Sequence, residues 1–381
     1  MAAKTIRPSI YTGIAGWALM LQHFVDTGLY ESEKEAENAL KQGLRCASSA
    51  AESLRDRPDR VVTFLEGRLG AMAVETAIEF DLGRQQPREV QTRVDAMRHL
   101  VVQALRLPES DCDLLYGRAG TLFSVAYLRR RLRNPSLFSP EAAALVRQIL
   151  DEGLRKGAQI GTSFAWEWHQ KFYWGAAHGF AGILSVLLLF PSEVDLAARE
   201  MRLLDVWNLL ADALGYLLSD AEGGSGGALL RSGNMKSSSS STQDRLVQWC
   251  HGAPGWIWPL CLWVLQSRPS PWKGQRRKEH LILHALGEAV WARGLLKKGV
   301  GLCHGIAGNG YALLALYRLT KDTLWLRRAN AFARFALAHL DELREVPDRP
   351  HSLFEGMAGL ACFLASLRKP DSATMPGWIL D

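Results

Sequence analysis

Apolar runs recur along the chain, and each begins directly at a pair of glycines in the pattern Gly-x-x-Gly. Seven pairs occur, and the first glycines of consecutive pairs are 54, 50, 62, 73, 53 and 51 residues apart. Self-similarity at a period of this size indicates a repeat architecture. The pairs begin at Gly13, Gly67, Gly117, Gly179, Gly252, Gly305 and Gly356.

The residues that follow the glycine pairs predict buried helices. After Gly120 the chain reads TLFSVAYL, and after Gly182 it reads ILSVLLLF. Both segments are apolar on nearly every face, which is typical of a helix that is surrounded by other parts of the protein. We therefore expect the helices that start at the glycine pairs to form an inner layer.

Amphipathic segments separate the apolar runs and predict an outer layer. Ser139-Pro140-Glu141 is a helix start, with a capping hydroxyl, a proline in the first turn and an acid near the positive helix end. Residues 279–296 and 322–343 show helical periodicity with charged outer faces, and few segments alternate with a period of two. After residue 141, the apolar residues of this predicted helix lie on one face: Ala142, Leu145, Val146, Ile149 and Leu150.

These patterns predict an all-α fold: a double-layered α/α toroid, or barrel, of seven helical-hairpin repeats in one domain over residues 1–381. The glycines let backbones approach closely around a central cavity. If the inner helices all start at one end, their positive N-termini converge there and favour anions. The Gly- and Ser-rich residues 222–242 predict a flexible loop.

Composition and charge narrow the class of protein. The apolar share of 48% and the charged share of 22% are ordinary for a globular protein, no secretory signal is evident, and the longest strongly apolar run, 180–190, is about half of a membrane span. The net charge of +6 is spread without a basic stripe, which argues against nucleic-acid binding. The basic residues form either a solvated surface or a basic cavity rim that attracts an anionic peptide or glutathione. Six scattered cysteines favour reduced thiols and a cytoplasmic location.

Cysteine and histidine stand at the glycine turns of three repeats. Repeat five reads Trp249-Cys250-His251-Gly252, repeat six reads Leu302-Cys303-His304-Gly305, and repeat four reads Ala177-His178-Gly179. Neighbouring inner turns of a ring are close in space, so these side chains should meet. Two thiolates and an imidazole suit zinc, and three protein ligands leave a fourth position open, as in catalytic sites. Arg118 and Arg245, near two of the turns, are additional candidates for the cavity.

The chain resembles the lanthionine synthetase C-like family, which includes bacterial lanthipeptide cyclases and eukaryotic LanC-like proteins. The resemblance covers nearly all of it, through YTGIAGWA, TFLEGRLG, LLYGRAG, EWHQKFYWGAAHGFAGI, WCHGAPG, GLCHGIAGN and SLFEGMAG. The residues of several motifs are similar to those of the eukaryotic branch. The resemblance implies an α/α toroid with a zinc ion at its centre.

Site residues follow from this resemblance by motif position. His178 matches the histidine that performs acid/base work in the cyclases, and Asp113 falls where they carry a catalytic aspartate, although it could simply cap the next helix. Lys298 matches a lysine that contacts the anionic peptide or glutathione, although it could equally be solvated. Glu66 and Glu355 precede glycine pairs, and we expect them to bond backbone amides between repeats. The implied zinc ligands are Cys250, Cys303 and His304.

The chain departs from the family pattern in three places. The first glycine pair begins at Gly13, so the family's usual N-terminal segment is shortened or missing here. His251 stands where the cyclases often have tyrosine, and the Ser-rich insert ahead of Cys250 is unusual. These differences leave the cavity rim and the affinity for ligand open.

The resemblance implies a zinc-dependent enzyme that adds a thiol to dehydroalanine or dehydrobutyrine. In the eukaryotic branch the thiol is glutathione, and the acceptors are proteins whose phosphoserine or phosphothreonine has lost phosphate. The alternative is a non-catalytic protein that binds glutathione and zinc in regulation. A zinc-using prenyltransferase subunit fits poorly, since such barrels use an Asp, Cys and His triad. Nuclear location and peripheral membrane association remain open besides the cytoplasm.

Overall fold

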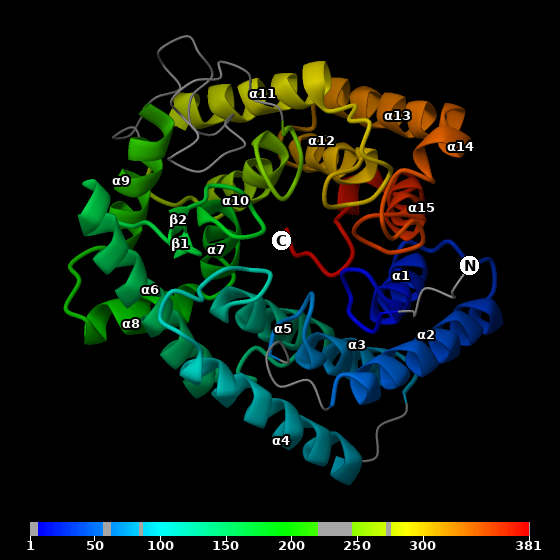
Figure 1. Cartoon of the computed structure of the whole chain (residues 1–381), viewed down its shortest axis with the longest axis horizontal. Helices are drawn as coiled ribbons and strands as arrows, with labels where there is room; N and C mark the ends of the chain where they lie inside the picture. The colour runs from blue at the N-terminus through cyan, green and yellow to red at the C-terminus, as the bar shows by residue number, and fades with distance from the viewer. Residues whose placement is uncertain (1–6, 56–61, 84–86, 220–245, 272–275, 381) are drawn as a thin grey trace.

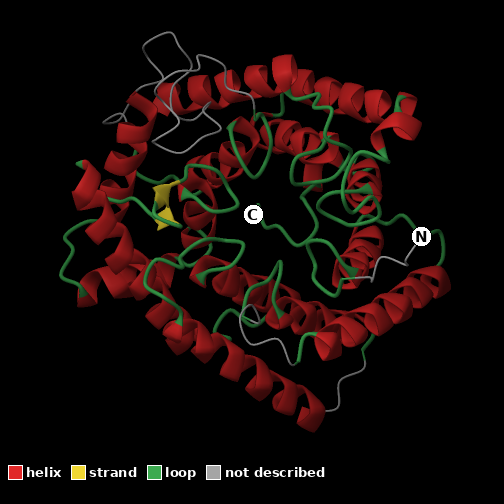
Figure 2. Cartoon of the chain, viewed as in Figure 1, coloured by secondary structure: helices red, strands yellow, loops and turns green. Residues whose placement is uncertain are grey.

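The computed structural model describes residues 7–55, 62–83, 87–219, 246–271 and 276–380. The predicted loop at 222–242 and the candidate Arg245 lie outside these residues. The described chain is mostly helical, and its two short strands, β1 (Glu167–Trp168) and β2 (Lys171–Phe172), pair antiparallel (Figure 2). The prediction that strands are minor is therefore confirmed.

Among the described residues, seven helices surround the centre of the molecule (Figure 1). Each has the first glycine of a Gly-x-x-Gly pair as its N-cap residue, as the sequence predicts. Their side chains are largely buried, and α5, α7 and α10 are buried almost all round over their first two turns. The inner helices are α1 (Ile14–Asp26), α3 (Arg68–Asp81), α5 (Arg118–Arg131), α7 (Phe180–Leu187), α10 (Ala253–Leu265), α12 (Ile306–Thr320) and α15 (Met357–Ser366).

A second set of helices lies outside the first (Figure 1). The start of α2 has a complete capping box, in which Ser32 and Glu35 each satisfy the other's backbone amide. In the described chain the hairpin prediction needs one correction: α15 is followed only by the short 3₁₀ helix η4 (Pro370–Ser372), not by an outer helix. The outer helices are α2 (Glu33–Ser53), α4 (Pro87–Gln103), α6 (Ser139–Ile160), α8 (Pro191–Glu200), α9 (Val206–Ser219), α11 (Arg276–Arg293), α13 (Thr323–Ala338) and α14 (Leu340–Leu343).

Backbone hydrogen bonds join the turns that precede consecutive inner helices. At six of the seven junctions in the described chain, the residue two before a repeat's first glycine donates its N–H to the carbonyl of the equivalent residue in the next repeat. The last bond, from Phe354 to Tyr11, joins repeat seven to repeat one and so closes the circuit at 3.1 Å. Repeats two and three are joined differently, by Phe64 N–H to the Gly120 carbonyl at 3.0 Å. The equivalent pairs are Tyr11–Leu65, Leu115–Ala177, Ala177–Cys250, Cys250–Cys303, Cys303–Phe354 and Phe354–Tyr11.

The second glycine of each pair lets the start of the inner helix pack against the turn that precedes it in the same repeat. A Cβ atom on Gly308 would lie 1.9 Å from the carbonyl oxygen of Leu302, and one on Gly182 would lie 1.9 Å from that of Ala176. No side chain fits at such distances, because they are well inside van der Waals contact. The glycine pattern therefore records where a helix start packs directly against the preceding turn.

No described helix is by itself long and apolar enough to cross a membrane. Helices α7 and α8 pass that test of length and composition only when taken together, and the chain bends by 98° between them. All the side chains of α7 are buried in the inner layer.

A buried polar cluster links α1, α12 and α15 inside the inner layer. His23 Nε2 lies 2.8 Å from Ser366 Oγ, and the Tyr311 hydroxyl lies 2.8 Å from the same oxygen. Burial lowers the pKa of His23 from 6.5 to about 4, because the charged imidazolium would lose its hydration there. His23 is therefore neutral in the folded protein at neutral pH.

This shift predicts acid destabilisation. Between pH 6.5 and about 4 the unfolded chain binds a proton at His23 and the folded chain does not, so stability falls as the pH falls through this window. The free energy of unfolding should drop by about 3 kcal/mol from this group alone. Urea unfolding of the wild type and of His23→Gln at pH 7 and pH 4.5 measures the effect. The variant should lose much of the pH dependence; an identical dependence in both proteins would contradict the assignment.

Candidate metal centre and its surroundings

The structure brings Cys250, Cys303 and His304 together at the start of α10 and α12. Their candidate ligand atoms, two sulfurs and one imidazole nitrogen, all lie within 4.8 Å of one another. The bond from Cys250 N–H to the Cys303 carbonyl, at 3.3 Å, fixes the two turns side by side. The predicted meeting of these three side chains is therefore observed.

This donor set suits a tetrahedral metal ion. With Zn–S bonds of about 2.3 Å and Zn–N bonds of about 2.0–2.1 Å, tetrahedral ligand atoms lie roughly 3.3–3.8 Å apart. The observed spacing, within 4.8 Å, requires a contraction of only about 1 Å to reach that geometry. Three protein ligands also leave one coordination position for another molecule, so the residues fit a zinc ion of the catalytic type.

Hydrogen bonds hold both cysteine sulfurs in place. The Tyr11 hydroxyl donates to Cys303 Sγ at 2.6 Å, and Gln248 Nε2 donates to Cys250 Sγ at 3.0 Å. Lys298 Nζ in turn donates to Gln248 Oε1 at 3.3 Å, which places this lysine one residue away from a candidate ligand. Such outer contacts orient ligands and tune a metal site. Sequence reasoning missed Tyr11 and Gln248, although Tyr11 holds in repeat one the position that the cysteines hold in repeats five and six.

The two thiols influence each other strongly. The hydrogen bond from Cys303 lowers the pKa of Cys250 well below its ordinary value, in spite of burial. Burial raises the pKa of Cys303, and the neighbouring Cys250 adds to that effect. The protein alone thus favours one negative charge at this pair, and a bound divalent cation favours the thiolate form of both.

The partly buried His178 pairs with the buried Asp113, which lies one repeat away. Its Nδ1 lies 2.8 Å from Asp113 Oδ2, and the Tyr116 N–H donates to the same oxygen at 3.2 Å. Asp113 is only 2% exposed. The alternative that it caps the next helix is not observed, because the N-cap residue of α5 is Gly117 and no side chain caps that helix start. Donation from Nδ1 to the carboxylate leaves Nε2 as the imidazole nitrogen that can exchange a proton.

An aromatic surface fixes the plane of this imidazole. The Trp168 ring stacks on His178 with centroids 3.8 Å apart and planes 13° apart, and Tyr116 stacks less closely at 5.7 Å. Trp168 is presented by the β1–β2 hairpin, which sequence analysis did not foresee. The Ala177 N–H donates to the Cys250 carbonyl at 3.4 Å, so the pair lies on the turn next to the metal candidates.

The residues immediately before the first glycine of each Gly-x-x-Gly pair share a common environment. Six of them are polar and only partly buried, in contrast to the buried residues one position earlier. Burial raises the pKa of Glu355 and lowers that of His251. The expected bond from Glu355 to a backbone amide is not observed, since its Oε2 is buried without a partner in the described chain. The six residues are Glu66, Tyr116, His178, His251, His304 and Glu355.

Arg118 has a different environment from the one expected for a residue that contacts a ligand. It is 3% exposed, and its guanidinium donates to the carbonyls of Leu107, Pro108 and Asp111 and to the side chain of Gln148. These bonds secure the loop that leads to Asp113. The geometry therefore favours an architectural role for Arg118.

Comparison with known proteins identifies the group to which this chain belongs. The sequence model of the family described as Lanthionine synthetase C-like protein matches residues 5–380. The chain belongs to this family. Its LanC-like character agrees with the glycine turns and with the cluster of cysteines and histidine described above.

Two curated relatives and one solved structure support the assignment. The chain is 34% identical over 372 residues to glutathione S-transferase LANCL1 of Danio rerio, covering 96% of this chain and 84% of that protein. It is 33% identical over 391 residues to LanC-like protein GCL1 of Arabidopsis thaliana, covering 99% and 82%. The structure of nisin cyclase matches with a TM-score of 0.68 at 14% identity, covering 96% and 90% of the two chains, which confirms the predicted α/α toroid fold.

The cluster predicts binding of one divalent cation in tetrahedral sulfur-rich coordination. Cobalt(II) is a suitable probe, because thiolate ligation gives intense near-ultraviolet charge-transfer bands and tetrahedral geometry gives visible absorption. Titration of metal-free protein should saturate at one cobalt per chain, and Cys303→Ala should abolish both features. Cys261→Ala, a buried cysteine of α10 outside the cluster, is the matched control and should titrate like the wild type. Equal spectra for both variants would contradict the site.

Proposed function

We propose that this LanC-like protein is a zinc-dependent enzyme that adds glutathione to dehydroalanine or dehydrobutyrine residues in proteins. The observation that carries the proposal is the position of the Asp113–His178 pair on the turn next to the Cys250, Cys303 and His304 cluster. The relationship to a protein named glutathione S-transferase supports the choice of thiol. All six cysteines are free, which supports action in a reducing compartment, the cytoplasm.

Each of these residues has its own role in the proposed reaction. Cys250, Cys303 and His304 would hold the zinc ion, which when bound favours the thiolate form of a thiol in its open position. His178 accepts the thiol proton at Nε2 and later delivers it to the α-carbon. Asp113 keeps the imidazole in the correct tautomer and stabilises it while it carries the proton.

The reaction is balanced without any oxidant or reductant. The sulfur forms a bond to the β-carbon of the dehydroamino acid, and the carbon–carbon π bond breaks. The electron pair passes to the α-carbon and its carbonyl, and the proton that left the thiol ends on the α-carbon. The product is a thioether between the protein and glutathione.

Positive charge at this end of the ring supports an anionic thiol donor. The inner helices begin here, and each contributes the partial positive charge of an N-terminus. Lys298 is exposed near the cluster through its bond to Gln248, so it can reach a carboxylate of glutathione. Acceptor proteins would arise where phosphoserine or phosphothreonine has lost phosphate. Arg245 is proposed as a further contact on the basis of sequence alone.

The proposal predicts a mass increase of one glutathione on a dehydroalanine peptide incubated with zinc-loaded protein. Mass spectrometry should detect this product faster than in the absence of protein. His178→Ala should slow the reaction about 10²- to 10⁴-fold while zinc content stays at one per chain. Cys303→Ala should lose zinc and activity together, and Cys261→Ala should retain both.

Other outcomes would decide against the proposal. Wild-type protein with one zinc per chain that binds glutathione but gives only background addition would support the alternative, a non-catalytic binding protein. Full activity in His178→Ala would exclude this histidine from proton transfer. Activity that persists after zinc removal would exclude the metal.

A further inference from the structure

Tyr173 lies between the proton-transfer pair and the metal candidates, and none of the roles assigned above uses it. Its ring centroid is 6.2 Å from that of His178 and 6.1 Å from that of His251, the residue that follows Cys250. One tyrosine ring therefore contacts both of the turns that supply the chemistry. A substrate on which both turns act has to lie beside this ring.

Backbone packing fixes Tyr173 in this position. Its carbonyl oxygen accepts the N–H of Phe180, at the start of α7, at 3.1 Å. Two residues further along, a Cβ on Gly175 would lie 2.1 Å from the Cys250 carbonyl oxygen, so the segment packs directly on the metal turn. A group held in this way needs no reorganisation when a substrate binds, which is what electrostatic stabilisation of a transition state requires.

The ring of Tyr173 is packed, while its hydroxyl is left open. Trp168 meets the ring edge-on with centroids 5.8 Å apart, and the next residue, Trp174, is buried in the core. Within the part of the chain that the structure describes, the Tyr173 hydroxyl forms no hydrogen bond. It is not among the buried oxygens that lack a partner, so it is open to solvent. This hydroxyl can therefore donate a hydrogen bond to a ligand.

The proposed thiol addition creates a negative charge that none of the residues assigned so far stabilises. When the sulfur bonds to the β-carbon, the electron pair spreads over the α-carbon and the oxygen of its carbonyl, before His178 delivers the proton. A hydrogen-bond donor at that oxygen stabilises the transition state more than the ground state. His178 has to come within about 3 Å of the α-carbon to protonate it. The carbonyl is bonded to that carbon, so its donor has to stand beside His178, as Tyr173 does.

We propose that Tyr173 is a further catalytic residue, whose hydroxyl donates a hydrogen bond to the carbonyl oxygen of the dehydroamino acid. This inference rests on the proposed thiol addition and names the group that stabilises its enolate. The phenol keeps its proton throughout, and His178 still delivers the proton that ends on the α-carbon. The balance of bonds, electrons and protons in the reaction is therefore unchanged.

Isotope-edited infrared spectroscopy tests the contact without any turnover. The probe is a short dehydroalanine peptide with an isotope-labelled carbonyl, bound to the zinc-loaded protein in the absence of glutathione, so that no addition can occur. The carbonyl stretch should lie at a lower frequency in the wild type than in Tyr173→Phe, because a hydrogen bond weakens the carbon–oxygen double bond. Equal frequencies in the two proteins, or no bound carbonyl in the wild type, would overturn the proposal.

Kinetics of glutathione addition provide the second measurement. Tyr173→Phe keeps the ring against Trp168 and removes only the hydroxyl, so the zinc content and the KM for glutathione should change little. The kcat should fall about 10²- to 10³-fold, as for the loss of one donor to a developing oxyanion. The matched control is Tyr317→Phe, which removes a hydroxyl bonded to Asp371 near the far end of α12 and should react like the wild type.

The two measurements separate this proposal from the proposed enzyme activity. A frequency shift in the wild type that is lost in Tyr173→Phe, together with no turnover in either protein, supports the contact and contradicts only the enzyme activity. An undiminished kcat in Tyr173→Phe would overturn the catalytic role of this hydroxyl. Loss of zinc from Tyr173→Phe would also overturn it, because the residue would then support the metal turn and not the substrate.

Discussion

The circuit of backbone hydrogen bonds between glycine turns is the constraint on which the rest of this structure depends. It lets each inner helix begin beside its neighbour, and the bond from Phe354 to Tyr11 carries the circuit from the last repeat to the first. Glycine is required where a helix start meets the preceding turn, since a Cβ on Gly308 would lie 1.9 Å from a carbonyl oxygen. Tight turns at one end therefore set both the closure of the ring and the direction of all inner helices.

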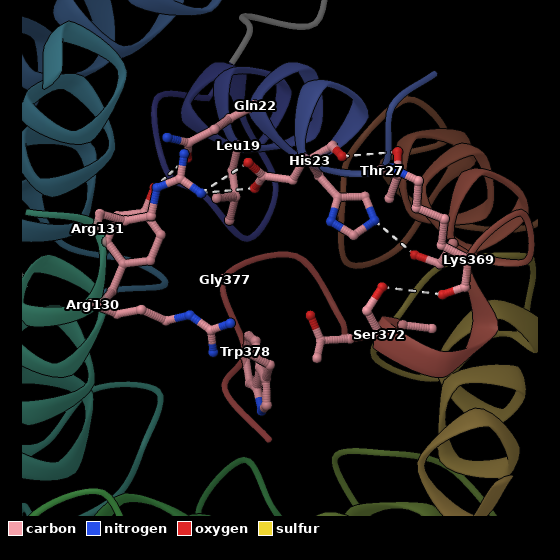
Figure 3. A pocket seen from close by; sticks show the side chains of 15 residues that line it. Leu19, Gln22, His23, Thr27, Arg130, Arg131, Lys369, Ser372, Gly377 and Trp378 are labelled. Carbon is pink, nitrogen blue, oxygen red and sulfur yellow. Dashed lines mark hydrogen bonds and ion pairs between the residues drawn. The ribbon is translucent and has the colours of Figure 1, made fainter. Parts of the chain in front are cut away.

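The same constraint assembles the chemistry from distant parts of the chain. The position two before the glycine is buried and supplies Cys250 and Cys303, while the next position is partly open and supplies His178 and His304. Because repeat one is bonded into the circuit, Tyr11 can donate its hydroxyl to Cys303 from 292 residues away. At the other end of the inner helices, residues of α1, α5, α15 and the C-terminal segment line a cavity (Figure 3).

Much of this arrangement could be predicted from the sequence, because it repeats. The glycine spacing gave the start of every inner helix, and the Cys-His pairs at equivalent turns gave the metal candidates. Features that depend on side-chain direction could not be predicted: Trp168 reaches His178 only because of a two-residue hairpin, and Gln248 reaches Cys250 from the same turn. Arg118 lies near a turn in sequence, yet its guanidinium is bonded to the loop behind it. In the described chain, α15 is followed by the short 3₁₀ helix η4 and not by the outer helix that the hairpin pattern predicts.

X-ray absorption at the zinc edge, measured on the protein with and without glutathione, tests the central claim most directly. The account predicts two sulfur neighbours at about 2.3 Å, from Cys250 and Cys303, and two lighter neighbours, from His304 and a water molecule in the fourth position, in the protein alone. With glutathione a third sulfur should appear at the same distance in place of one lighter neighbour. An unchanged count of two sulfurs at saturating glutathione, or three or four sulfurs before it is added, would contradict the claim that this centre binds and activates an external thiol.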